Sequence, residues 1–366
     1  MAPDRVLGGR APPAPADQDR RPGGSRAGVA TLRLDHVIGH ERVKAALERA
    51  WRQGRLVHAY LFAGPPQVGK RLLALELLRA LNCSDPAPPC GRCRSCRLAA
   101  GGQHPDIRLF GLAESEGSGR RQAIAIEQVR ALEHDCTLKP YLGAWKGYII
   151  DEAERLSLPA ANALLKTLEE PPPHVIIILV SRQPEALLPT LVSRCQTLRF
   201  GLLATAVIER ALIERFGAAP PDAALLARLA QGRLGWAVAA LSDRTLLDER
   251  QSALADLERL LGAETGERLA YAEHWAQLVG RDPDRALARL DCWLGWWRDL
   301  IFLHLGCPDL VVNVDREATL RALQATVPLA TARAVASQVA QTADYLAQNV
   351  NPRLALESLV LALPRR

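Results

Sequence analysis

Short apolar runs alternate with amphipathic stretches over the first half of the chain. Between residues 32 and 202, apolar runs of strand length occur at 59–63, 147–150, 175–180 and 198–200. The stretches between them carry apolar residues at helical spacing. Strands joined by helical crossovers form a parallel sheet, which helices cover on both faces. The pattern therefore predicts an α/β fold.

The second half of the chain has a different pattern, in which no further strand is predicted. Short helical stretches break at 217–221 and 232–235, and longer amphipathic helices follow. The N-terminal residues are rich in Pro, Gly, Ala and Arg and lack apolar periodicity, which is typical of disorder. The predicted organisation is a disordered tail at 1–31, an α/β domain at 32–202, a small helical domain at 203–247 and an all-α domain at 248–366.

The net charge is compatible with a nucleic-acid partner but does not establish one. The chain has a formal net charge of +6, and an arginine bias spread over solvated faces explains that value equally well. No apolar run reaches the ~20 residues that a membrane span needs. The N-terminus carries charges and prolines in place of the apolar core of a secretory signal, so we expect a cytoplasmic protein without a membrane partner.

A phosphate loop is predicted at residues 64–70, which read GPPQVGK. The segment follows a predicted strand and opens a helix, the context in which glycines let backbone N–H groups close on phosphates. Gly64 and Gly69 supply that freedom, and Lys70 can reach the β- and γ-phosphates. The next position requires Ser or Thr for Mg²⁺, but the residue is Arg71, which has no acceptor for a metal. The loop thus leaves ATP binding open and argues against Mg²⁺.

An acidic pair supplies the second half of the expected nucleotide site. Asp151 and Glu152 follow the predicted strand at 147–150. Asp151 would stand at the Mg²⁺ position, and Glu152 would polarise an attacking water.

Four of the eight cysteines lie close together in the sequence, at Cys83, Cys90, Cys93 and Cys96. Two successive C-x2-C steps bring thiolates close enough for one tetrahedral metal, and a closed set of four thiolates indicates structural zinc. The proline-rich intervening segment cannot build a core of its own, so a metal would hold it. An iron–sulfur cluster is the rival, but its fourth cysteine is expected downstream and followed by proline.

These features together resemble the clamp-loader branch of the AAA+ proteins, which in bacteria supplies the delta-prime and gamma/tau subunits of DNA polymerase III. The resemblance covers residues 32–364. The segments that carry it are HAYLF at 58–62, the cysteine insert, ANALLKTLEEPP at 161–172, Ser193-Arg194-Cys195, WWRDL at 296–300 and NVNPRLALE at 349–357.

The resemblance implies a RecA-like AAA+ domain with a parallel sheet, a small helical lid and an all-α C-terminal collar that joins a ring. It implies gamma/tau and delta subunits as partners through the collar, and ATP-driven loading of the sliding clamp onto primed DNA. It also implies that Val37 and Ile38 lie on the adenine side.

Two departures from the family pattern favour a stator of the delta-prime type over a motor. Arg71 replaces the Mg²⁺ ligand, and Gly235 stands where the lid arginine is expected. The chain would then have weak or no ATPase activity, with Glu152 vestigial. The resemblance implies that Arg194 acts as an arginine finger on ATP bound by a neighbour, although a solvated surface arginine is the simpler interpretation of that residue alone.

Three alternatives remain open from the sequence. One is a gamma/tau-type ATPase motor, and another is a purely structural collar protein with a relic nucleotide site. A branch-migration helicase of AAA+ type is disfavoured by the cysteine insert and the collar-like end. No polymerase active site is visible, so a DNA-directed DNA polymerase classification would follow only from membership of the holoenzyme.

Overall fold

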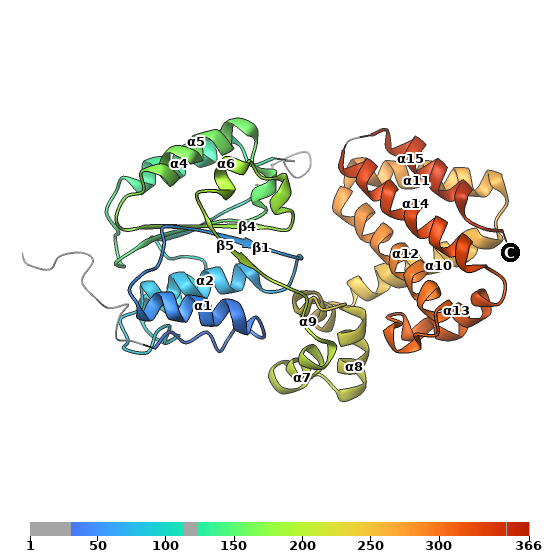
Figure 1. Ribbon diagram of the computed structural model, residues 1–366, viewed down its shortest axis with the longest axis horizontal. Coiled ribbons are helices and arrows are strands. Elements are labelled where there is room, and N and C mark those ends of the chain that lie inside the picture. The colour runs from blue at the N-terminus through green and yellow to red at the C-terminus, as the bar shows by residue number, and fades with distance from the viewer. Residues whose placement is uncertain (1–30, 113–122, 349, 366) are drawn as a thin grey trace, which may run out of the picture.

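The computed structural model describes residues 31–112, 123–348 and 350–365. All but the last residue of the predicted tail at 1–31 lies outside the described residues, as does Asn349 of the collar-like segment. An α/β half and a helical half lie at opposite ends of the molecule, and a small group of helices joins them below (Figure 1). No helix among the described residues is long and apolar enough to span a membrane.

A five-stranded parallel sheet forms the centre of the α/β half, in the order β2-β3-β4-β1-β5. Its registers are regular, with Leu61 opposite Leu179 on one side and Thr197 on the other. The prediction of a parallel sheet is confirmed. The strands are β1 (Ala59–Ala63), β2 (Ile107–Phe110), β3 (Lys146–Ile150), β4 (Val175–Ser181) and β5 (Gln196–Arg199).

The two edge strands are where the apolar pattern was least informative. The pattern missed β2 altogether, because two of its four residues face solvent and Leu109 is 56% exposed. At the other edge, β5 begins two residues earlier than the predicted strand, and Phe200 lies beyond its end. An edge strand is covered on fewer sides than a central one, so it needs no continuous apolar run.

Helices cover both faces of the sheet, as Figure 1 shows. On one face α1 (Glu41–Arg52) and α2 (Lys70–Leu81) pack on Tyr60 and Phe62, while the opposite side of β1 packs under the helices that follow β2, β3 and β4. Those helices are α4 (Ile126–Cys136), α5 (Leu158–Glu169) and α6 (Pro189–Val192). The hydroxyl of Ser157 accepts the N–H of Ala160 and caps the start of α5.

Three short helices follow the sheet and share a separate apolar cluster centred on Ile208, Leu212 and Leu226. They are α7 (Thr205–Phe216), α8 (Pro220–Leu229) and α9 (Leu234–Ser242). Gly217 ends α7 in the left-handed region with φ of 67°, a conformation that suits glycine.

The C-terminal helices enclose a further core built around four tryptophans, Trp275, Trp293, Trp296 and Trp297. The helices are α10 (Thr245–Gly262), α11 (Thr265–Arg281), α12 (Pro283–His304), α13 (Glu317–Gln324), α14 (Leu329–Ala347) and α15 (Pro352–Ala362). The predicted boundary at residue 247 falls within α10. The remaining helices are α3 (Arg94–Ala100), which follows the cysteine segment, and the 3-10 turns Ala153–Arg155, Pro184–Ala186, Pro308–Leu310 and Val314–Arg316.

Candidate functional site

The predicted phosphate loop connects β1 to α2 at the carboxyl edge of the sheet. Gly64 has φ of +148°, and a Cβ there would lie 2.2 Å from the carbonyl oxygen of Phe200, so only glycine fits. Gly69 caps α2 with φ of 103°. The backbone therefore has the strand–loop–helix path that a phosphate site requires.

The Lys70 side chain is buried and folds back over its own loop. Its Nζ donates hydrogen bonds of 2.5 Å to the carbonyl oxygens of Gly64 and Pro65. Burial lowers the pKa of Lys70 to about 8, against the opposing effect of the Glu154 and Asp151 carboxylates. The ammonium group that would meet a phosphate is thus satisfied by the chain itself.

A cavity of about 840 Å³ opens beside the loop. It lies between the phosphate loop, the carboxyl ends of the strands and the α7–α9 helices, and Val37 and Ile38 contribute to its wall. Apolar and charged groups share the lining, which includes Lys70, Arg71, Asp151, Glu152, Glu154, Arg182, Phe216, Leu234, Gly235 and Val238. The structure thus brings together the predicted loop residues, the acidic pair and Gly235.

Arg71 and Asp151 form an ion pair within this cavity, with Nη1 3.4 Å from Oδ2. The Asp151 carboxylate is the group expected to hold Mg²⁺, and a guanidinium occupies its vicinity instead. A cation on the chain therefore balances the charge that a metal would otherwise balance.

Glu152 lies beside the same cavity in the left-handed region, with φ of 50°. Its carboxylate lies 3.7 Å from Nε of Arg155, and Arg155 also contacts Asp284 on α12 at 3.3 Å. The predicted water-polarising group is therefore part of a charged contact that reaches the C-terminal helices.

The α7–α9 helices contact the phosphate loop directly through Gly235. Its N–H donates to the carbonyl of Gln67 at 2.7 Å, and a Cβ at this position would lie 2.8 Å from the same oxygen. On the other side of the loop, Nε2 of His40 lies 2.7 Å from the carbonyl of Val68. Sequence reasoning missed Glu154, Arg182 and the contact of Gln67 with Gly235, because only the folded chain brings these positions together.

Arg194 lies away from this cavity, directly after α6. Its guanidinium donates to the Thr190 carbonyl at 3.1 Å and to the Glu169 carboxylate at 2.5 Å. Glu169 is the last residue of α5, and about a third of the Arg194 side chain is exposed. The structure therefore does not bring Arg194 to the Lys70 site of the same chain.

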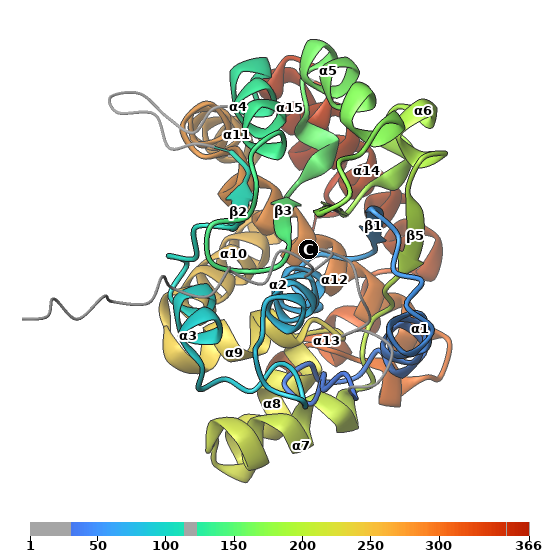
Figure 2. The ribbon, with the colours of Figure 1, turned by 90° about the vertical axis from the view of Figure 1, so that its left-hand side faces the viewer.

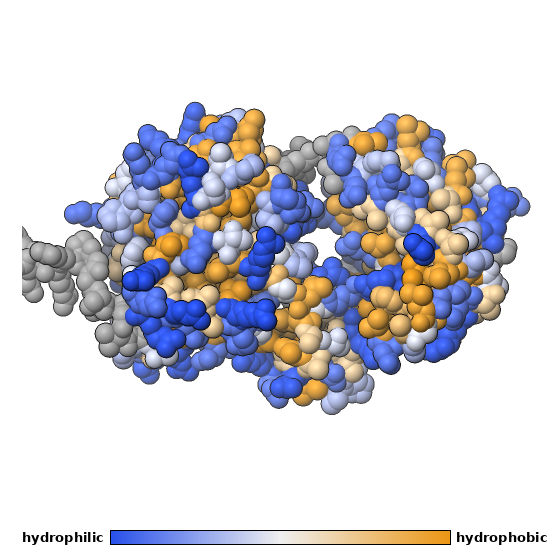
Figure 3. Space-filling view, in the orientation of Figure 1, coloured by the Kyte–Doolittle hydropathy of each residue, from blue (hydrophilic) through white to orange (hydrophobic). Residues whose placement is uncertain are grey.

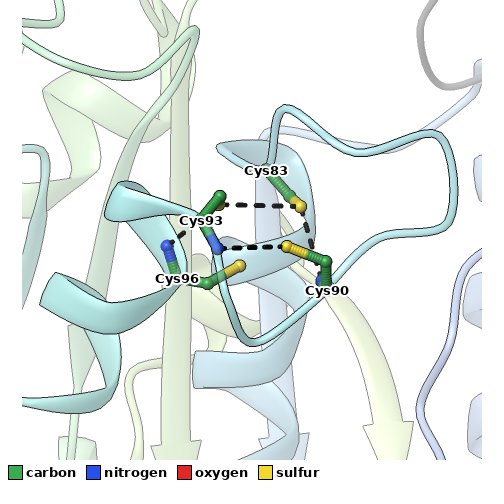
Figure 4. Close-up of side chains that lie close together, drawn as sticks. All are labelled: Cys83, Cys90, Cys93 and Cys96. Carbon is green, nitrogen blue, oxygen red and sulfur yellow. Dashed lines mark hydrogen bonds between the residues drawn. The ribbon is translucent and has the colours of Figure 1, made fainter.

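The four cysteines form a compact cluster between α2 and α3, with their sulfur atoms within 4.8 Å of one another (Figure 4). Sγ of Cys93 lies 4.0 Å from Sγ of Cys83, and sulfurs ~2.3 Å from a tetrahedral zinc lie about 3.8 Å apart. Backbone N–H groups point at three of the sulfurs at 3.3–3.4 Å, those of Cys83, Cys90 and Cys93. The cluster could thus bind a metal such as zinc.

The thiols of this cluster differ in acidity. At Cys93, burial acts to raise the pKa, but the N–H groups of Cys96 and Ser84 and neighbouring thiols outweigh it and lower the pKa to about 6. Burial raises the pKa of Cys96 to about 12. A cation among the sulfurs would favour the thiolate form of all four.

The sequence is similar to those of known DNA polymerase III subunits. Two family models match the chain, described as DNA polymerase III, delta subunit, at residues 39–203 and DNA polymerase III, delta subunit, C terminal, at residues 247–364. Subunit delta' of DNA polymerase III from Bacillus subtilis is 32% identical over 88% of this chain and 95% of its own length. The chain belongs to the delta-prime family of DNA polymerase III clamp-loader subunits.

The chain is also similar to a tau subunit in sequence and to a gamma subunit-related protein in structure. DNA polymerase III subunit tau of Escherichia coli is 37% identical over 70% of this chain, but over only 39% of tau's own length. A gamma subunit-related protein from Thermotoga maritima has a known structure that covers 88% of this chain and 97% of its own, at 18% identity and a TM-score of 0.41. The sequence relatives, and not that structure, establish the family.

The buried ammonium of Lys70 makes a testable contribution to stability. Its folded pKa of about 8 lies below the ordinary lysine value of 10.5, so the unfolded chain binds more protons between those pH values and stability rises with pH across them. The free energy of unfolding of the wild type relative to Lys70→Met should increase by about 2–3 kcal/mol from pH 8 to pH 10.5. Denaturant unfolding at several pH values measures this difference, and Lys139→Met is the control at an exposed lysine. A difference that stays flat would contradict the buried ammonium.

Proposed function

We propose that this chain is the stator of a DNA polymerase III clamp loader and does not hydrolyse ATP itself. The Arg71–Asp151 ion pair is the observation that carries this proposal, because a guanidinium stands where a motor would hold Mg²⁺. Gly235 supports it from the lid side, since a glycine has no side chain with which to contact a γ-phosphate. Arg71 thus supplies no ligand for the metal, and Gly235 supplies no cation from the lid.

The division of labour within the chain follows from this proposal. Residues 32–202 would form the AAA+ domain, 203–247 the lid and 248–366 the collar that binds gamma/tau and delta subunits. Apolar side chains gather on the C-terminal helices near α13 and α14 (Figure 3), which suits a surface that other subunits cover. The assembly would act on the sliding clamp and primed DNA in the cytoplasm.

The nucleotide site of a stator should bind phosphate weakly and should not hydrolyse ATP. ATP could engage Lys70 only after Lys70 leaves the carbonyl oxygens of Gly64 and Pro65. Metal-dependent hydrolysis also needs a ligand that Arg71 does not supply.

We expect negligible ATP turnover by the purified chain. Arg71→Thr should restore Mg²⁺-dependent ATP binding, because it frees Asp151 and adds a hydroxyl ligand, yet turnover should remain low because Gly235 is unchanged. Calorimetric ATP titration with and without Mg²⁺, together with a phosphate-release assay, measures both properties. Rapid hydrolysis by the unmodified chain would instead identify a gamma/tau-type motor.

We infer that the cysteine cluster holds one structural zinc. The four sulfurs leave no open position, so the metal would fix the fold of residues 83–100 and take no part in chemistry.

Elemental analysis of the purified chain should find one zinc per molecule. Cys93→Ser should lower that content and increase hydrogen exchange over residues 83–100, because one thiolate ligand is lost, while leaving nucleotide affinity unchanged. Cys307→Ser is the matched control, since Cys307 lies outside the cluster. A metal-free wild-type chain, or one that contains iron with visible absorbance, would exclude the zinc site.

We propose that Arg194 completes the ATP site of a neighbouring subunit. It lies at the end of α6, away from the cavity of its own chain, and a guanidinium can contact two phosphate oxygens at once. In the isolated chain, Glu169 and Thr190 hold it.

Arg194→Ala, reconstituted with wild-type partner subunits, should assemble normally but show reduced DNA-stimulated ATPase and clamp loading. Fingers in other NTPases contribute on the order of 10³–10⁵ in rate, and the loss here should be smaller because only one of several sites is affected. Arg194→Lys should rescue poorly, since lysine lacks the two-pronged geometry, and Arg210→Ala on α7 serves as the control. Full activity of the alanine variant would reduce the role of this chain to that of a scaffold.

A further inference from the structure

The loop that enters β3 and the cysteine segment lie together at the amino edge of the sheet, opposite the nucleotide cavity. The loop at 137–145, which enters β3, contacts the residue that immediately precedes the cysteine cluster. The N–H of Trp145 donates to Oδ1 of Asn82 at 3.0 Å, and a Cβ at Gly143 would meet the same side chain at 1.9 Å. Figure 2 looks onto this side of the molecule, where α3 lies. The loop and the cysteine segment therefore adjoin each other.

Buried hydrogen bonds fix the loop rigidly to α3. Oγ of Ser95 on α3 lies 2.9 Å from Nε2 of His104, whose Nδ1 accepts the N–H of Asp106 at 3.0 Å. The Asp106 side chain, in turn, accepts three backbone N–H groups of the loop at 2.6–2.8 Å, those of Tyr141, Leu142 and Gly143. Asp106 is only 2% exposed, so this carboxylate holds the loop from inside the protein.

The side chains that this framework presents are aromatic and cationic. Tyr141 is 86% exposed at the tip of the fixed loop. An aromatic ring usually stabilises a protein by being buried, so this exposure is unfavourable for the isolated chain. The segments 83–100 and 137–145 contain four cations, all exposed, and Asp85 as their one carboxylate. The cations are Arg92, Arg94, Arg97 and Lys139.

We propose that this face binds single-stranded DNA, with Tyr141 as a stacking platform and the cations of segments 83–100 and 137–145 on the phosphates. Proteins that bind single strands without sequence preference combine cationic tracks with exposed aromatic rings, because every base offers a π-face. An acidic peptide would use the same cations but would not need a ring held clear of the surface. The contact requires neither ATP nor a neighbouring subunit, so it stands independently of the stator role.

Fluorescence anisotropy of a labelled oligo-dT 20-mer, titrated with the full-length chain at several salt concentrations, tests this proposal. Tyr141→Ala should weaken binding roughly 5- to 20-fold, whereas Tyr141→Phe should bind like the wild type. Arg97→Ala should weaken binding and reduce the slope of log K against log salt by about 0.7. Arg210→Ala on α7 is the control for loss of one exposed arginine elsewhere. Arg97 is preferred to Arg92, whose guanidinium is paired with Asp85 at 2.9 Å.

Asp106→Asn tests whether DNA binding depends on the fixed loop or only on charge attraction. Removal of a carboxylate would by itself tighten DNA binding, but release of the loop should weaken it, and the proposal expects weaker binding. Circular dichroism and metal content check the fold, and if this variant does not fold, the Tyr141 and Arg97 variants decide. Equal binding by Tyr141→Ala and wild type, or displacement of the DNA by poly-glutamate at equal charge concentration, would overturn the proposal in favour of an acidic-peptide surface.

Discussion

Burial of the central strands on both faces is the constraint on which the arrangement of every site depends. All residues of β1, β3 and β4 are buried, so neither face of the central sheet can present chemistry to solvent. Functional groups are therefore confined to the loops at the two ends of the strands. The carboxyl edge holds the phosphate loop, Arg71, Asp151 and Glu152, and the amino edge holds the cysteine cluster and the loop of Tyr141.

Groups at the carboxyl edge find their partners within the chain. Lys70 donates to two carbonyls of its own loop, Arg71 pairs with Asp151, and the backbone of Gly235 bonds to Gln67. A nucleotide that engages Lys70 would have to replace the two Lys70 contacts with ones at least as favourable, because a buried unpaired charge is costly. The internal contacts of Lys70 and Arg71 and the missing Mg²⁺ ligand thus have the same effect, since both disfavour ATP turnover.

The sequence predicted those features that local pattern determines. Continuous apolar runs identified β1, β3 and β4, and the glycine and cysteine spacings located the phosphate loop and the metal cluster. It did not predict β2, whose Arg108 and Leu109 face solvent, nor the contact of Arg194 with Glu169, since nothing in the spacing of these residues encodes it. The Asp106 contacts to the loop at 141–143 were missed for the same reason. Such contacts depend on the order of strands in the sheet, which the periodicity of a single chain leaves undetermined.

The α/β half, the α7–α9 helices and the C-terminal helices meet mainly through polar contacts, because each apolar cluster lies within one of these parts. The segment 231–235 illustrates this arrangement. At one end, Oε1 of Gln231 accepts from Arg298 on α12 at 2.8 Å, and at the other end the N–H of Gly235 reaches Gln67. Gln231 and Gln67 both have positive φ, of 50° and 59°, a strain that persists only where surrounding contacts impose it. Any rotation of α7–α9 must keep or exchange both bonds, and polar contacts of this kind exchange at a lower cost than a shared apolar core would.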